Sequence, residues 1–178
     1  MRSIASAALL VGLAVGSVYA APLTLQATDK DLGRTIGQYM LSAHNVHFGS
    51  KQDSEDRTTL MRMVASEKVP EYAFAIIPIP SERDEQDNVT AQSLLLMVIS
   101  ELKVPAEKRA AALEAMNKLN DENDFTHLYI DGDNDVAFRW TLTVTEAGLP
   151  ADNVWDAYAG MLPAWEAAGE TLSNLLAK

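Results

Sequence analysis

The residues that could hold a metal or act as acids and bases gather in one polar stretch. His44 and His47 form an H-x-x-H pair, and Asp53, Glu55 and Asp56 follow. Two histidines at this spacing bind zinc when one helix presents both and a carboxylate completes the site. The apolar pattern of the preceding segment ends just before this pair, so a helix would not carry both rings. We therefore favour exposed loop histidines, and we keep a cation-dependent hydrolytic enzyme using His44, His47 and the nearby acids as the alternative.

A second acidic group, from Asp131 to Asp135, resembles the start of a calcium-binding loop. A helix-loop-helix calcium site needs Gly at its sixth position and a bidentate Glu at its twelfth. Counted from Asp131, these positions hold Val136 and Leu142, so the match fails. Asp, Gly and Asn are also the residues of tight hairpin turns. The sequence predicts a hairpin turn here and leaves weak cation binding open.

Motifs of nucleophilic, metal-dependent and nucleotide chemistry are absent from the sequence. It contains no G-x-S-x-G, no H-E-x-x-H, no phosphate-binding glycine loop and no dinucleotide fingerprint. Most acidic pairs lie in polar runs, whereas a general acid needs a carboxyl group whose pKa is shifted by burial. We predict that the protein is not an enzyme and uses no cofactor.

The first twenty residues are typical of a secretory signal. Arg2 precedes an apolar run from Ile4 to Val18, and small side chains stand at Val18 and Ala20. The run is shorter than the ~20 residues that span a bilayer, so we expect no stable membrane anchor. The chain has no Cys, which excludes a lipid anchor at the cleavage point, disulfides and thiol chemistry. We predict cleavage after Ala20 and a periplasmic or secreted protein.

Length and charge limit the remaining possibilities. Residues 21–178 are enough for one ordinary domain that is stabilised by its apolar core. The net charge is −11, and it becomes −12 when a leader containing Arg2 is removed. Such a surface repels nucleic acid and anionic lipid. A basic partner, a cation or plain solubility remain as explanations of the charge.

The first half of the chain predicts one helix and a three-stranded meander. Thr28 and Asp31 form a capping box for a helix from Asp29 to Ala43, in which two glycines require close packing. Asn45 to Arg57 is polar and predicts a loop. Three apolar segments follow. The first, Thr58–Ala65, is ambiguous between strand and helix. The second, Tyr72–Ile79, predicts a strand that lies at a sheet edge or whose ladder ends at Pro78. The third, Ser93–Ser100, is continuously apolar and predicts a strand covered on both faces.

The second half predicts a helix, a hairpin and a long final helix. The first helix opens at Pro105 and ends near Asn120. In the hairpin we expect Ile130 to pair with Val136, Leu128 with Phe138 and Thr126 with Trp140 on the buried side, and His127 with Arg139 outside. The last helix starts near Pro150 and has a long apolar stripe. Trp155 falls off this stripe and either packs on a neighbouring loop or contacts a partner.

The stretch from Ala112 to Leu162 resembles the YbjN-like family of bacterial domains. The resemblance rests on an Asn-ending helix, an aromatic residue that opens a strand, an acidic turn, an apolar strand with an Arg and a helix entered through a polar loop. It implies a single α+β domain of order α-β-β-β-α-β-β-α, with an antiparallel sheet packed against helices as in type III secretion chaperones. It also implies a role in regulating sensory transduction and supplies no catalytic residues.

We therefore expect an exported, non-catalytic binding module, chaperone-like or regulatory. Its partner would be a protein or peptide, held by an exposed sheet face or by the last helix. We expect the last helix and the neighbouring sheet edge, with Trp155 at the contact, to form either a homodimer interface or a surface for another partner.

Export gives the first test. N-terminal sequencing of the protein from a periplasmic fraction should find Ala21 as the first residue, because the small residues Val18 and Ala20 fit a leader peptidase site. A mature form that keeps Met1 and stays in the membrane pellet would contradict this prediction.

Overall fold

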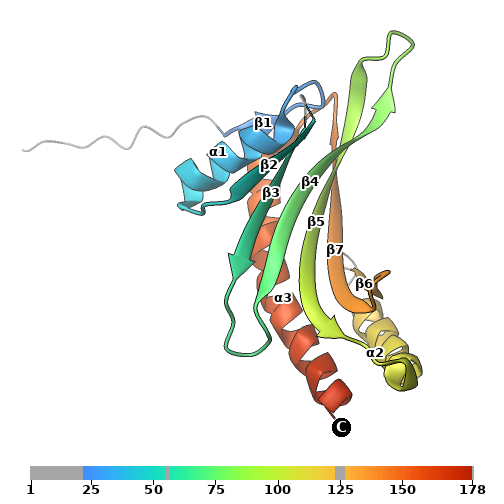
Figure 1. The fold of residues 1–178 in the computed structure, drawn as a ribbon. Coiled ribbons are helices and arrows are strands. Elements are labelled where there is room, and N and C mark those ends of the chain that lie inside the picture. The colour runs from blue at the N-terminus through green and yellow to red at the C-terminus, as the bar shows by residue number, and fades with distance from the viewer. Residues whose placement is uncertain (1–21, 55–56, 123–126, 178) are drawn as a thin grey trace, which may run out of the picture.

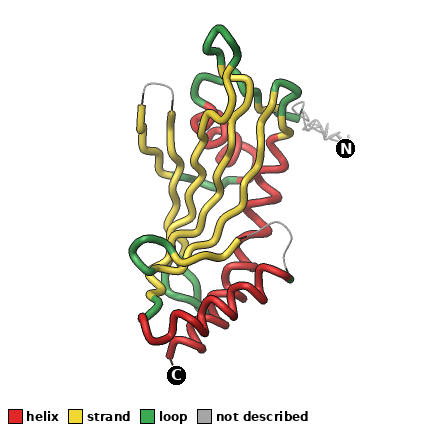
Figure 2. The backbone as a smooth tube through the Cα atoms, turned by 90° about the vertical axis from the view of Figure 1, so that its right-hand side faces the viewer, coloured by secondary structure: helices red, strands yellow, loops and turns green. Residues whose placement is uncertain are grey.

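A computed structural model describes residues 22–54, 57–122 and 127–177. Its centre is a six-stranded antiparallel sheet with strand order β2-β3-β4-β5-β7-β6, and the described helices lie along one side of it (Figures 1 and 2). The α+β class and the antiparallel sheet predicted from the sequence are confirmed. In chain order the described elements are β1 Thr24–Leu25, α1 Leu32–His44, β2 Gly49–Ser54, β3 Arg57–Val64, β4 Tyr72–Arg83, β5 Val89–Lys103, the short helix η1 Ala106–Lys108, α2 Arg109–Asp121, β6 His127–Ile130, β7 Asp135–Thr145, β8 Leu149–Pro150 and α3 Ala151–Ala177.

The predicted loop from Asn45 to Arg57 is wrong, because it contains the edge strand β2. The sequence GSKQDS has no apolar alternation to mark it. An edge strand bonds to one neighbour only, and the side chains of residues 49–53 are exposed, so nothing requires them to be apolar. The ambiguous segment Thr58–Ala65 is a strand, β3, which pairs with β2 and β4.

Helix α1 begins three residues later than predicted, because Asp31 is its N-cap. The Asp31 carboxylate accepts a hydrogen bond from the backbone N–H of Arg34 at 3.1 Å. It also accepts one from the Thr58 hydroxyl at 2.8 Å. An acceptor at the N-cap satisfies an amide that the helix leaves free. The same carboxylate therefore starts the helix and ties it to β3, and Thr28 does not cap it.

Two glycines let α1 lie directly on β3. A Cβ atom at Gly33 would lie 1.9 Å from the carbonyl oxygen of Thr58, and one at Gly37 would lie 3.1 Å from Cδ2 of Leu60. The close packing that the sequence required at these positions is present. Because α1 sits on β3, it leaves the helix-side face of the outer strand β2 without a helix of its own.

Strand β5 is covered by helices on one face only, whereas the sequence predicted cover on both faces. Leu94, Leu96 and Val98 are fully buried under the helices. Their neighbours on the opposite face, Leu95, Met97 and Ile99, are only partly covered or exposed. The continuous apolar run was expected to be covered on both faces, and the described part of the chain covers only one.

The expectation for Pro78 is confirmed, since the β3–β4 ladder ends at Ile76 and Pro78 pairs with β5 alone.

The hairpin has the predicted register. Ile130 pairs with Val136, Leu128 with Phe138 and His127 with Arg139, while Thr126 lies outside the described residues. Trp140 was expected in the core and is only half-buried, whereas Ala137, expected on the open side, is buried. The Asn120 side chain accepts from the N–H of Leu128 and donates to its carbonyl, which joins the end of α2 to β6.

The core lies between the sheet and the long helix α3. Trp165 and Leu172 of α3 are buried, and Tyr158 packs edge-to-face on Phe74 of β4 with 4.9 Å between ring centroids. Tyr158 also contacts Phe48, the residue just before β2. Aromatic pairs of this kind contribute about 0.5–1.5 kcal/mol beyond their buried area. The apolar stripe predicted for the last helix is therefore used inside the domain.

The glycine contact gives a matched pair of variants. Gly33→Ala should lower the free energy of unfolding by about 1–3 kcal/mol, because the new methyl group overlaps the Thr58 carbonyl. Gly160→Ala, in the exposed middle of α3 with nothing within 4 Å of a Cβ atom, should raise it by about 0.5–1 kcal/mol through helix propensity. Urea denaturation measures both, and a neutral Gly33→Ala would contradict the packing of α1 on β3.

Candidate functional site

No described helix covers the face of the sheet opposite the helices, and we call it the open face. Successive cross-strand partners define its rows. The open face consists of Met61–Ala75–Met97–Arg139–His127, Met63–Ala73–Ile99–Ala137–Tyr129, Ile77–Leu95–Thr141 and Ile79–Ser93–Thr143. In these rows the part on β3, β4 and β5 is apolar except for Ser93, and the part on β7 and β6 is mixed. The same face continues with polar residues at Thr59 of β3, whose hydroxyl donates to Asp53, and at Lys51 of β2. Figure 2 shows the strands with helices on one side only.

Exposure confirms that this face is uncovered by the described chain. Met63 is 57% exposed, Met61 44%, Ile99 39% and Ile79 38%. Four of the seven large apolar side chains that are exposed in the described residues thus lie on this one face. Scattered exposed apolar residues are ordinary, but a contiguous patch marks an interaction surface.

The apolar rows combine long and short side chains. Ala75 is fully buried although it faces away from the helices, because the longer side chains of Met61 and Met97 flank it in register. Methionine is unbranched and polarizable, so it adapts to the shape of what it touches. A surface of this composition suits an apolar partner without a fixed side-chain pattern.

Arg139, the cationic residue in these rows, lies near the edge strand β6. Arg139 of β7 sits over the ring of Tyr129 of β6, with 5.4 Å from its Cζ to the ring centroid. This contact keeps the guanidinium near the edge strand β6 and away from the methionines of β3. The centre of the face on β3 to β5 therefore carries no charged side chain.

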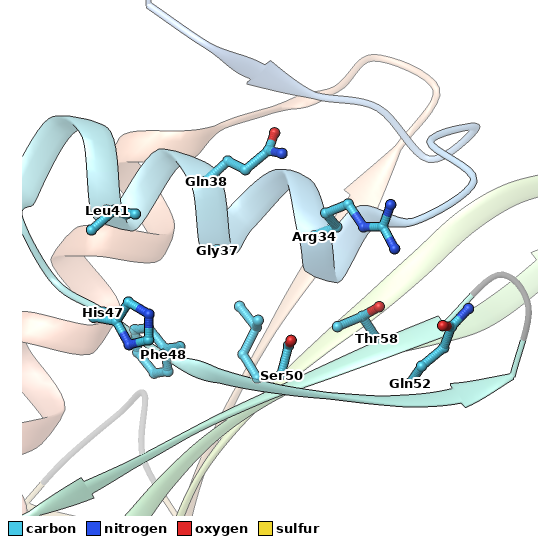
Figure 3. Close-up of a pocket in the computed structure, with 10 residues that line it drawn as sticks. Arg34, Gly37, Gln38, Leu41, His47, Phe48, Ser50, Gln52 and Thr58 are labelled. Carbon is cyan, nitrogen blue, oxygen red and sulfur yellow. The ribbon is translucent and has the colours of Figure 1, made fainter.

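A pocket of ≈ 440 Å³ lies on the other side of the sheet, between α1 and β2 (Figure 3). Figure 3 shows Ser50 and Gln52 rising from β2 toward the helix. Arg34, which lines the pocket, is paired with Asp31 at 3.4 Å. None of the buried polar atoms that lack a partner in the described residues belongs to a lining residue. The pocket follows from the placement of α1 on β3, and no side chain in it demands a ligand.

The structure does not bring the predicted H-x-x-H pair together as a metal site. His44 stacks on Trp155 of α3 with ring centroids 3.9 Å apart and an interplanar angle of 3°. His47 lines the pocket beside β2. Asp53 accepts a hydrogen bond from Thr59 at 2.5 Å and is paired with Arg57. Glu55 and Asp56 lie outside the described residues, and no group of three metal-ligating side chains occurs within them.

The cluster around His44 joins α1 to α3. The Tyr39 hydroxyl donates to the Asp152 carboxylate, and its oxygen accepts from Nε2 of His44 at 2.9 Å. Burial, followed by the hydrogen bond and charge of Asp152, raises the pKa of Tyr39 to about 12. The phenol therefore keeps its proton at neutral pH and cannot act as a base. Trp155, which the sequence offered as a partner contact, is a packing residue of this cluster.

The acidic turn between β6 and β7 is a hairpin turn, as predicted. The Asp131 carboxylate accepts from the backbone N–H groups of Asp133 and Asp135, each at 2.9 Å. Asn134 takes the left-handed φ of 65° that the turn needs. Lys103 donates to Asp135 at 2.9 Å, which raises the pKa of Lys103. Two of the acids are thus engaged by the protein itself.

The fold and the open face together define an α+β domain that presents an apolar sheet surface. Residues 89–159 match the model of the YbjN family, which is described as "Putative bacterial sensory transduction regulator". The resemblance expected from the sequence is confirmed over these residues, which run from the start of β5 into α3. No curated protein matches the chain. Among the described residues no helix is long and apolar enough to cross a membrane.

The sequence predicted an exposed sheet face as one of two binding surfaces but did not identify the residues of the open face, although a signal for them was present. Met61 and Met63 of β3 alternate with Leu60, Arg62 and Val64, and Ile99 of β5 ends the apolar run from Leu94. A strand that is apolar on both faces must have two covers. Only three helical segments were predicted. If all three pack on one face of the sheet, the other face has no helix to cover it.

The His44 cluster predicts a pH dependence. Tyr39 has a folded pKa of about 12 against an unfolded value of 10.0, so its contribution is complete below pH 10 and is lost as the pH rises toward 12. The difference in unfolding free energy between wild type and Tyr39→Phe should therefore shrink between pH 10 and 12. Urea midpoints at successive pH values measure it, and a constant difference would contradict the assigned hydrogen bond.

Proposed function

We propose that this protein is an exported, non-catalytic binding module, regulatory or chaperone-like, whose open face holds a segment of a partner protein. The observation that carries the proposal is the apolar face of β3, β4 and β5, which no described helix covers. Removing apolar area from water contributes about 25 cal/mol per Å². A partner that covers this face would therefore gain binding energy without any change in the fold.

The face suits binding better than the sheet edges do. One edge, β2, carries Lys51 and Asp53, and the other, β6, has only four residues. Charged side chains and short strands protect an edge from pairing with another chain. A partner strand would find little to extend at either edge, whereas the face offers broad apolar contact.

The family match supports a regulatory or binding role. It covers β5 and β7, which contribute the central part of the open face, while Met61 and Met63 lie before the matched residues. Export is part of the proposal and rests on the layout of residues 1–20. A chain without cysteine folds the same way in an oxidising and in a reducing compartment, so the cysteine count does not bear on export.

Site-specific photo-crosslinking in the cells that make the protein tests the proposal. A photoreactive residue at position 63 or 97 should give a crosslinked adduct of defined mass, because both positions lie on the open face. Position 113 of α2 is the matched control, since Leu113 is equally apolar and 40% exposed but lies in the helix layer. Adducts from position 113 alone would place the partner on the helices and contradict the proposal.

A further inference from the structure

The pocket between α1 and β2 needs no ligand to satisfy its polar atoms, but its lining is unusual for this chain. The protein has 25 acidic residues, and none of them is among the ten described residues that line the pocket. The ionisable side chains of the lining are Arg34 and His47, and neither can carry a negative charge. An anion in this pocket therefore meets no acidic side chain of the lining.

Both walls of the pocket belong to regular elements. The helix wall is one stripe of α1, which runs from Arg34 to Leu41 at three- and four-residue steps. On the sheet side, Ser50 of β2 pairs with Leu60 of β3, so both side chains lie on the face that α1 covers. The volume of ≈ 440 Å³ lies within the range of about 300–1,000 Å³ that is usual for small-molecule sites. The fold therefore forms this pocket without any rearrangement.

The pocket has a polar end and an apolar end. Figure 3 shows Arg34 and Gln52 at one end, and Leu41 and Phe48 at the other. The seven residues from Arg34 to Leu41 rise ~1.5 Å each, so the two ends are about 10 Å apart. Phe48 is buried, whereas Leu41 is 47% exposed. An apolar group that lies between these two side chains removes the exposed surface of Leu41 from water, which favours binding.

Arg34 at the polar end can bind a second anion. It is paired with Asp31 through its Nε atom at 3.4 Å, yet 65% of its side chain is exposed. The Asp31 carboxylate also accepts from the backbone N–H of Arg34 and from the Thr58 hydroxyl, so it does not depend on the guanidinium alone. The planar guanidinium matches the geometry of a carboxylate. One arginine beside one aspartate offers too little positive charge for a dianion, so the site favours a monoanion.

We infer that this pocket binds a small carboxylate that carries an apolar body about 10 Å long. The carboxylate lies at Arg34, and the apolar body lies between Leu41 and Phe48. This site is separate from the open face, because its walls stand on the other side of the sheet.

An NMR titration of the backbone amides with octanoate, below the concentration at which it forms micelles, tests the inference. Octanoate should bind saturably and shift the amide signals of residues 37–41 and 50–52, which line or adjoin the pocket. Octylammonium has the wrong charge and acetate has no apolar body. Both should bind at least about threefold more weakly, since a single exposed ion pair is modest. The neutral 1-octanol should bind more weakly than octanoate at the same site.

Two matched pairs of variants separate the two ends of the pocket. Arg34→Gln should weaken octanoate about three- to fivefold and leave 1-octanol unchanged, whereas Arg109→Gln removes the same charge from α2 and should change neither. Leu41→Gln should weaken both ligands. Leu113→Gln, at a similarly exposed leucine of α2, should weaken neither.

Three results would overturn the inference. The first is the absence of saturable binding, or shifts confined to open-face residues such as Met63 and Ile99. The second is equal affinity for octanoate, 1-octanol and octylammonium, which would mean apolar contact without recognition of the anion. The third is equal octanoate binding by Arg34→Gln and Arg109→Gln. None of these results bears on the proposed function, which rests on the open face.

Discussion

A sheet has two faces, and the described helices of this chain cover one of them. The placement of the helices on one face depends first on Gly33, where the absence of a Cβ atom allows α1 to rest on the Thr58 carbonyl. Tyr158 and Trp165 of α3 fill the same side through their contacts with Phe74 and Phe138. With its helices committed there, the described chain has no element left for the opposite face. The apolar residues of that face remain in contact with water.

Some residues of the alternative site are engaged in structural contacts. His44 is taken up in joining α1 to α3 through Tyr39, Asp152 and Trp155, so it is not available beside His47. The acidic turn uses its carboxylates to fix its own backbone and Lys103. His44 and the carboxylates of the acidic turn, which were candidates for metal binding in the sequence, thus form contacts that hold structural elements together. The surface that remains is apolar and suited to binding.

Local patterns predicted the second half of the fold well. The hairpin register follows from strict alternation together with the length of the turn, which place Leu128 opposite Phe138 on the buried face. Strand β2 could not be predicted, because an exposed edge strand needs no apolar pattern. The cap at Asp31 was missed because Thr28 and Asp31 also fit a capping box that starts three residues earlier, and the bond from Thr58 that ties Asp31 to β3 spans 27 residues. An exposed sheet face was predicted, but its residues were not, because burial depends on how many layers the chain supplies and no single strand contains that information.

The central claim is that the open face is bare in solution. Methyl NMR of the methionines with a soluble paramagnetic agent tests it directly, because Met61, Met63 and Met97 lie on that face while Met40, Met116 and Met161 are buried. The account predicts strong broadening of the first three methyl signals and protection of the other three. Protection of Met61, Met63 and Met97 in the isolated protein would show that the face is already covered and would contradict the account.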